Sequence, residues 1–234
     1  MNNLADNWII YKDEYLVAVN KPSGMIVHRG WDNDAVTVAD IVRDKIVGAP
    51  VHAVHRLDRG TSGVLIFALD AETTRFLQKQ FTSDKICKKY IALVRGPMRE
   101  PCVLDHAIPN RNDGERVPAI TKFRPLAHLH RWTLLEAIPL TGRLHQIRRH
   151  LKHLGHPVVG DVRYGKGDVN RFFRNHFNLS RMALHCYEIV VETPGNKRIS
   201  LLARVPSDLS EPLIMMGIWP SVQNVAQSVS NSDL

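Results

Sequence analysis

Short apolar runs separated by polar turns dominate the chain, a pattern more typical of strands than of long helices. Residues 8–11 and 15–19 are two such runs, split by the polar Lys12-Asp13-Glu14, and they predict a hairpin. Residues 64–69 are six consecutive apolar residues, enough for a buried strand and too few for a helix. Further strands, the last two joined by a turn, are predicted over 130–138, 182–191 and 198–205.

Residues 88–94 alternate between the two faces of another predicted strand. If Ile91 and Leu93 face the core, Lys89 lies on the same side and must extend its ammonium toward solvent. Tyr90, with Ala92 and Val94, then takes the opposite face.

Capping signals mark the predicted helices. Thr37 and Asp40 resemble a capping box at the start of an apolar stripe that ends at Gly48. Asp70 can cap a helix that carries three apolar side chains on one side. A last helix is predicted over 208–218.

The order of these elements indicates the fold class. Because strands mostly follow hairpins instead of alternating regularly with helices, the pattern favours an α+β fold over a doubly wound parallel sheet. No internal repeat or long linker interrupts residues 1–220, which we expect to form a single domain. Residues 221–234, rich in Ser, Asn and Gln, are expected to be a disordered tail.

The charge of the chain is strongly positive. Lys and Arg number 31 against 23 Asp and Glu, a formal net charge of +8. That excess fits a partner that carries phosphates better than one that carries carboxylates, although a generic basic enzyme remains the alternative. Since 44% of the 234 residues are apolar, the chain can bury a substantial core.

Cysteine usage and the absence of targeting signals indicate a cytoplasmic protein. Cys87, Cys102 and Cys186 lie far apart and are odd in number, so a disulfide framework is not expected and a reducing compartment is. The N-terminal residues lack the basic and apolar regions of a signal peptide. No apolar run approaches the ~20 residues that span a bilayer, so no membrane association is expected.

The segment His55-Arg56-Leu57-Asp58-Arg59-Gly60-Thr61-Ser62-Gly63 is the first candidate site. It places the carboxylate of Asp58 between the guanidinium groups of Arg56 and Arg59, just before the buried strand predicted over 64–69. A structural ion pair that closes the turn would explain Asp58 by itself. Nine specified positions rarely occur together by chance, so the segment as a whole is a specific motif.

The segment from Thr141 to Gly155 is the second candidate site. Leu144, Ile147, Leu151 and Leu154 fall on one helical face, with Thr141 as the predicted cap and Gly155 at the end. An adjoining cationic side carries His145, Arg148, Arg149 and Lys152. Because cations early in a helix oppose its dipole, Arg143 and His145 favour a ligand or ion-pair partner over a merely solvated face.

The twelve histidines raise the question of a metal site. His150, His153 and His156 recur every three residues, which spreads them around a helix instead of bringing them together. His52 and His55 have no cysteine or carboxylate at a spacing suited to a shared ligand set. We therefore expect no metal.

Four segments together resemble RNA pseudouridine synthases of the RluA family. The nonapeptide at 55–63 resembles the family's active-site motif, and residues 142–148 resemble its Gly-Arg-x-His-Gln-x-Arg motif. Residues 88–92 resemble its Lys-x-Tyr-x-Ala segment, and residues 181–185 resemble the segment that supplies an apolar residue to the uracil pocket. The resemblance implies a mixed, mainly antiparallel sheet with a central catalytic cleft and flanking helices.

The resemblance also implies roles for individual residues. Asp58 would be the catalytic aspartate and Arg148 its counter-ion, which keeps a desolvated carboxylate charged. Tyr90 would stack on the target base and take part in proton transfer. The residues predicted to contact substrate are His55, Arg56, Arg59, Leu184, Arg143, His145, Arg149 and Lys152.

The expected reaction is the isomerisation of uridine to pseudouridine in RNA, without cofactor or metal, by a monomer that lacks an appended S4-type RNA-binding domain. Residues 21–29 and 167–171 look most like the branch that modifies tRNA at uridine 65, the TruC type. The connection from Asp105 to Lys122 looks short, which leaves ribosomal RNA as the alternative substrate. A non-catalytic RNA-binding protein and a histidine- or metal-dependent hydrolase are the rival functions.

Overall fold

The computed structural model describes residues 6–29, 36–83, 86–110 and 114–219. The chain divides into two compact units. Unit 1 comprises 1–90, 140–142 and 185–204, and unit 2 comprises 91–139, 143–184 and 205–234. The division into a catalytic domain over 1–220 stays a prediction, and the tail at 221–234 lies outside the described residues.

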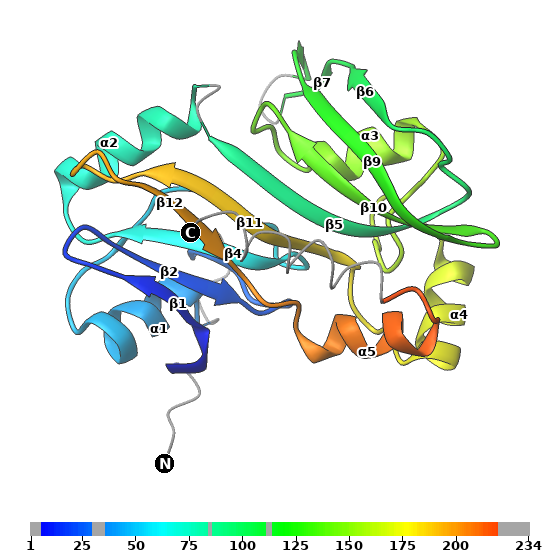
Figure 1. Cartoon of the computed structure of the whole chain (residues 1–234), viewed down its shortest axis with the longest axis horizontal. Helices are drawn as coiled ribbons and strands as arrows, with labels where there is room; N and C mark the ends of the chain where they lie inside the picture. Colours follow the sequence, from blue (N-terminus) through cyan, green and yellow to red (C-terminus); the bar gives the residue numbers. More distant parts are fainter. Residues whose placement is uncertain (1–5, 30–35, 84–85, 111–113, 220–234) are drawn as a thin grey trace, which may run out of the picture. The chain divides into compact units, whose positions relative to one another are not determined.

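Unit 1 is built on a mixed sheet (Figure 1). Its strands are β1 (Ile9–Lys12), β2 (Leu16–Lys21), β3 (His52–Ala53), β4 (Ser62–Ala68), β11 (Leu184–Glu192) and β12 (Arg198–Leu202). The pairs β1–β2, β2–β4, β3–β4 and β11–β12 are antiparallel, whereas β4 and β11 are parallel. The predicted hairpin at the N-terminal end is confirmed. The apolar run after the nonapeptide is β4, a strand buried along its whole length.

Capping side chains start the helices of unit 1 as predicted. Thr37 and Asp40 form the reciprocal capping box of α1 (Val38–Ile41), which continues as a wider π-helical turn over Val42–Val47. Asp70 Oδ1 accepts from Thr73 N at 2.8 Å and caps α2 (Ala71–Phe81). α2 packs against β3 and β4.

Strand β5 (Cys87–Arg95) contains the boundary between the units. The strand predicted over 88–94 is present, and every residue from Tyr90 to Val94 is buried, so both of its faces are covered there. β5 has sheet neighbours on both edges, β11 and β10, so it is a central strand. Central strands covered on both faces lose the alternation that an open face produces. Lys89 is half-buried and pairs with Glu188 instead of extending freely into solvent.

Unit 2 contains a second antiparallel group of strands. β10 (Trp132–Pro139) lies between β5 and β9 (Ile120–Leu129), and β6 (Cys102–Asp105) pairs with the other edge of β9. β10 was predicted from the sequence, but β9 and β6 were not, because basic residues and Pro125 interrupt the apolar pattern of β9. The connection from Asp105 to Lys122 was expected to be short. It contains two paired strands, β7 (Ile108–Pro109) and β8 (Arg116–Val117).

The described part of unit 2 contains three helices. They are α3 (Gln146–His153), α4 (Gly167–Phe177) and α5 (Ser207–Met215). α3 packs on β9 and β10, and α4 contacts α5. α4 was missed by the sequence analysis, and Phe173 is its one fully buried side chain, with its ring edge-on to Trp132 at 4.6 Å. The α+β class with a mixed, mainly antiparallel sheet is confirmed. Within the described ranges, no helix is long and apolar enough to cross a bilayer.

Candidate active site

Asp58 lies in the loop between β3 and β4 of unit 1, and a buried lysine fixes this loop. Lys21, at the end of β2, is 0% exposed. Its Nζ donates to three backbone oxygens, those of Pro22 (2.8 Å), Met25 (2.7 Å) and Arg59 (3.3 Å). Because a buried ammonium needs such partners in place of water, Lys21 ties the segment after β2 to the residue that follows Asp58.

The backbone reinforces this connection. Gly24 N donates to Arg59 O at 2.7 Å, and Arg59 Nε donates back to Gly24 O at 2.9 Å. The guanidinium of Arg59 therefore joins two loops, and its predicted contact with substrate stays a prediction. Leu57 is buried and anchors the loop, so that Asp58 is half-buried and Arg56 exposed.

His55 is held by the core of unit 1. Its Nε2 accepts from Ile66 N at 3.2 Å, and its ring stacks on Phe81 with centroids 4.6 Å apart. Burial, together with the positive charge of Lys88, lowers the pKa of His55 to about 3. The imidazole is thus neutral and positions the start of the Asp58 loop. A direct contact with substrate stays a prediction.

Tyr90 of β5 is 8% exposed and lies close to Asp58 and Cys186. Burial raises the pKa of Tyr90 well above its usual value, and Cys186 and Asp58 raise it further. The phenol is therefore protonated at rest and can donate a proton. Acting as a base in a later step requires that an earlier step has removed this proton.

A glycine allows β11 to pass directly beside the Asp58 loop. Gly63 has φ +118°, and a Cβ on it would lie 2.0 Å from Cys186 O. Cys186 is its partner in the parallel pairing of β4 with β11. The close approach of β11 therefore explains why a glycine stands at position 63, the end of the nonapeptide.

Leu184, the predicted floor of the uracil pocket, is 3% exposed at the start of β11. Arg181 fixes the backbone around it, because its Nε donates to Met182 O at 3.0 Å and its Nη2 donates to Leu184 O at 3.1 Å. Its Nη1 pairs with Asp208 at 2.9 Å. The sequence analysis did not identify this role of Arg181, and the role of Leu184 stays a prediction.

Arg148 of α3 forms a bidentate ion pair with Asp161 inside unit 2. Nε donates to Oδ2 at 2.7 Å and Nη2 donates to Oδ1 at 2.9 Å, with both side chains buried. Burial alone would raise the pKa of Asp161, but hydrogen bonds from Arg148 and from the Tyr164 backbone N–H hold it below its usual range. Asp161 was missed because no periodic pattern surrounds it. The predicted pairing of Arg148 with Asp58 stays a prediction.

The start of α3 differs from the prediction. The helix begins at Gln146 after His145, whose φ is +54°, so Thr141 does not cap it. Gln146 takes over this role because its side chain is buried, accepts from Arg143 N at 3.0 Å and donates to Ile120 O at 2.9 Å. The predicted end at Gly155, with φ +79°, is confirmed.

Cations of α3 surround Tyr164, another residue that the sequence analysis missed. Its hydroxyl oxygen accepts a hydrogen bond from Arg149 Nε at 3.0 Å and lies 3.1 Å from His145 Nδ1. The ring centroid is 5.1 Å from Arg148 Cζ, 5.8 Å from Lys152 Nζ and 5.6 Å from Arg163 Cζ. Arg148 is buried and therefore does not belong to the exposed cationic side that was predicted for α3. Arg143 Nε, outside the cluster, donates to Pro118 O at 3.2 Å.

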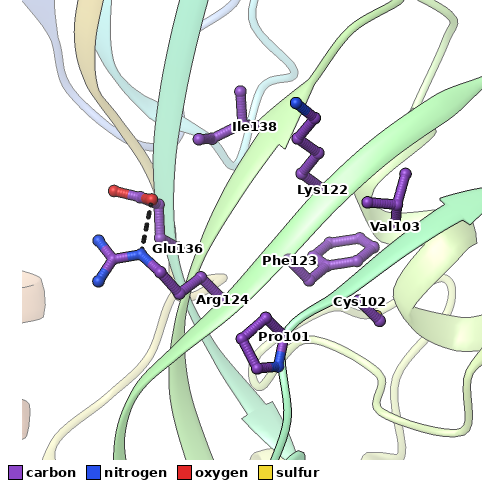
Figure 2. A pocket seen from close by; sticks show the side chains of 8 residues that line it. All are labelled: Pro101, Cys102, Val103, Lys122, Phe123, Arg124, Glu136 and Ile138. Atoms are coloured by element: carbon purple, nitrogen blue, oxygen red, sulfur yellow. Dashed lines mark hydrogen bonds and ion pairs between the residues drawn. The ribbon is translucent and has the colours of Figure 1, made fainter.

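A separate pocket of about 340 Å³ opens on β6, β9 and β10 of unit 2 (Figure 2). Its lining is mainly apolar, and Arg124 pairs with Glu136 at 3.2 Å along one side. None of the predicted site residues lines it.

The histidines of α3 make structural contacts. His150 Nδ1 lies 2.9 Å from Thr121 Oγ1 and its Nε2 lies 2.9 Å from His106 O, while the His153 ring stacks on His106 at 3.7 Å. In the described part of the chain, no three His, Cys, Asp or Glu side chains are grouped to hold a metal ion. Cys87, Cys102 and Cys186 form no disulfide in the structure.

Comparison with known proteins identifies the family. The family model described as RNA pseudouridylate synthase matches residues 15–153, more than half of the chain. The chain belongs to this family. Its members isomerise uridine to pseudouridine in RNA, so the chain is an isomerase that acts on RNA.

Individual relatives are similar over most of their length. A tRNA pseudouridine synthase C of Vibrio cholerae is 43% identical over 204 residues, covering 77% of this chain and 83% of the relative. That of Vibrio vulnificus is 38% identical over 91% of this chain and 96% of its own. Among solved structures, human RNA Pseudouridylate Synthase Domain Containing 4 is 26% identical with a TM-score of 0.75, covering 92% of this chain and 95% of that chain.

Proposed function

We propose that this RNA pseudouridine synthase modifies tRNA, at uridine 65 in the acceptor and T-stem region. Relatives named tRNA pseudouridine synthase C share about 40% identity with it over most of both chains, which supports tRNA as the substrate. Residues 21–29 and 167–171, which resemble the uridine-65 branch, support the position.

Asp58 is the group that acts on the nucleoside in this proposal. It is half-buried, close enough to Tyr90 to raise the pKa of the phenol, and held by a loop that Lys21 fixes. The proximity of this carboxylate to the phenol is the observation that carries the catalytic assignment. Asp58 either attacks C1′ of the ribose as a nucleophile or removes the C2′ proton, and the glycosidic bond breaks in both routes.

Tyr90 and Arg148 complete the catalytic set. Tyr90 stacks on the uracil and handles the proton that leaves C5 after the base has turned. Arg148 serves as the counter-ion of Asp58, and Asp161 fixes two of its guanidinium nitrogens for that purpose. Arginine suits this role because it stays charged in any surroundings.

The cations of unit 2 hold the RNA backbone. Arg143, Arg149 and Lys152 carry positive charge, His145 lies at the start of the same helix, and Arg56 adds another cation in unit 1. Such contacts position an RNA without reading its sequence. The enzyme acts as a monomer and needs no metal or cofactor.

Two substrates and one variant test the proposal. Purified protein is incubated with unmodified total tRNA and, separately, with ribosomal RNA that lacks pseudouridine, and pseudouridines are mapped. We expect modification of tRNA at a single uridine. Modification confined to ribosomal RNA would overturn the substrate and leave the chemistry intact. Asp58→Asn should abolish turnover while RNA affinity stays within a few-fold, and measurable turnover by this variant would remove Asp58 from its role.

A further inference from the structure

Lys88 is largely buried in unit 1, and no hydrogen bond or ion pair of its ammonium is identified among the described residues. The residue, two positions before Tyr90 in β5, is 8% exposed. Its Nζ lies 6.0 Å from the centroid of the Phe81 ring. A Cβ built on Gly142 would lie 3.8 Å from Nζ, so the backbone of Gly142 is close as well. Neither neighbour offers a negative charge.

The other shielded lysines of this unit have partners. Lys21 is surrounded by three backbone oxygens, and Lys89 forms a 2.7 Å ion pair with Glu188. A buried charge without a partner is costly and is rare in folded proteins unless a ligand meets it. Lys88 is therefore poorly explained by the stability of the free protein.

Lys88 belongs to the same cluster as the proposed catalytic groups. Residues two apart in a strand share a face, which places Lys88 and Tyr90 on one side of β5. The side chain of Cys186 lies near both of them, and Asp58 lies near Tyr90. Burial lowers the pKa of Lys88, so an anion bound nearby would stabilise its charged form.

We propose that Lys88 is a catalytic residue whose ammonium contacts a carbonyl oxygen of the target uracil and stabilises the negative charge of the detached base. This inference rests on the proposed function. It gives the ammonium of this largely buried lysine an anionic partner.

The reaction requires such a charge. When C1′–N1 breaks, its electron pair leaves with the uracil, and the resulting anion shares its charge between N1, O2 and O4. At C1′ the bond is replaced by an ester to Asp58, or the ribose loses its C2′ proton to Asp58 and becomes a glycal. The uracil then turns, and C5 bonds to C1′ as the ester breaks or the glycal regains its proton. Loss of the C5 proton and protonation of N1 complete the isomerisation without oxidation or reduction.

Lysine fits this step better than the neighbouring groups. Tyr90 is a protonated phenol whose pKa is raised, so it offers a hydrogen bond but no positive charge. His55 is neutral. A fixed cation in a site from which water is excluded stabilises developing charge strongly, and removal of one such group typically lowers the rate about 10²–10³-fold.

The test compares Lys88→Met with Lys89→Met, a control in the same strand. Single-turnover rates, RNA affinity and the unfolding midpoint of the free protein are measured for both. We expect Lys88→Met to lower the single-turnover rate about 10²-fold, to bind RNA within about two-fold of wild type, and to raise the unfolding midpoint, because an unpaired buried charge is replaced by an apolar chain. Lys89→Met should keep the rate and lower the midpoint, because Glu188 loses its partner.

A second variant separates charge from shape. Lys88→Arg keeps the positive charge and should retain more of the rate than Lys88→Met does. A wild-type rate in Lys88→Met would overturn the proposal, as would a rate loss accompanied by a lower unfolding midpoint, which indicates a structural role. If Lys88→Met binds RNA more weakly and the slope of log affinity against log salt falls by about one, Lys88 contacts a phosphate group and not the uracil. Wild-type turnover, measured in parallel, tests the proposed function independently.

Discussion

Arg148 and Asp161 form a two-point ion pair in the interior of unit 2, with N–O distances of 2.7 and 2.9 Å. Asp161 also accepts hydrogen bonds from the backbone N–H groups of Arg163 and Tyr164. The pair therefore joins α3 to the turn that follows Val159 and sets the orientation of the guanidinium of Arg148. Much of what we expect from mutagenesis follows from this arrangement.

Asp161→Asn should destabilise the protein by about 3–5 kcal/mol at neutral pH, because it leaves the buried charge of Arg148 without its partner. The pKa of Asp161 is lowered in the folded protein, so its contribution is present above its unfolded pKa of ~3.9 and is lost as the pH falls through the folded value. Denaturant unfolding of the wild type and of Asp161→Asn at neutral and acidic pH measures this contribution. If the difference in unfolding free energy between the two proteins stays constant down to the lowest pH, Asp161 does not have a lowered pKa in the folded protein.

Arg148→Met should reduce turnover far more than RNA binding, since it removes the proposed counter-ion of Asp58. Arg149→Met and Lys152→Met should instead weaken RNA binding and each lower the slope of log affinity against log salt by about one. Single-turnover rates and binding isotherms at several salt concentrations distinguish the two effects. If all three variants weaken RNA binding equally and none lowers the single-turnover rate, the proposed role of Arg148 as counter-ion of Asp58 is wrong.

Gly63→Ala should be strongly destabilising, because its Cβ would lie 2.0 Å from Cys186 O and the backbone has φ +118°. Either β11 moves away from β4 or the loop that carries Asp58 shifts. Gly167→Ala is the matched control, since nothing lies within 4 Å of a Cβ there and the change should be neutral or stabilising by about 0.4–1 kcal/mol. Thermal unfolding compares the two, and equal midpoints would refute the packing argument.

Turnover should be unaffected by EDTA, because the proposed chemistry uses only side chains. The measurement is pseudouridine formation before and after exhaustive chelation. Inactivation that zinc or magnesium restores would favour a metal-dependent mechanism instead.

Local patterns in the sequence were enough to predict the hairpin of β1 and β2, the buried strand β4 and the caps at Thr37 and Asp70. Each depends on neighbours within a few residues, where side-chain periodicity and capping chemistry act directly. The motifs around Asp58, Tyr90 and Arg148 also sufficed to identify the family. They are specific combinations of residues and need no coordinates.

Only the tertiary structure decided which groups meet. Lys21 and Arg59 are 38 residues apart, and a three-carbonyl cage around an ammonium leaves no periodic trace in sequence. Asp161 is 13 residues from Arg148, too far for the contacts of one helix. β9 escaped prediction because its Lys and Arg side chains lie on an open face, whereas β5 was predicted from its apolar residues and is covered on both faces. Burial on a given face depends on the layers packed against it, and local sequence does not specify those layers.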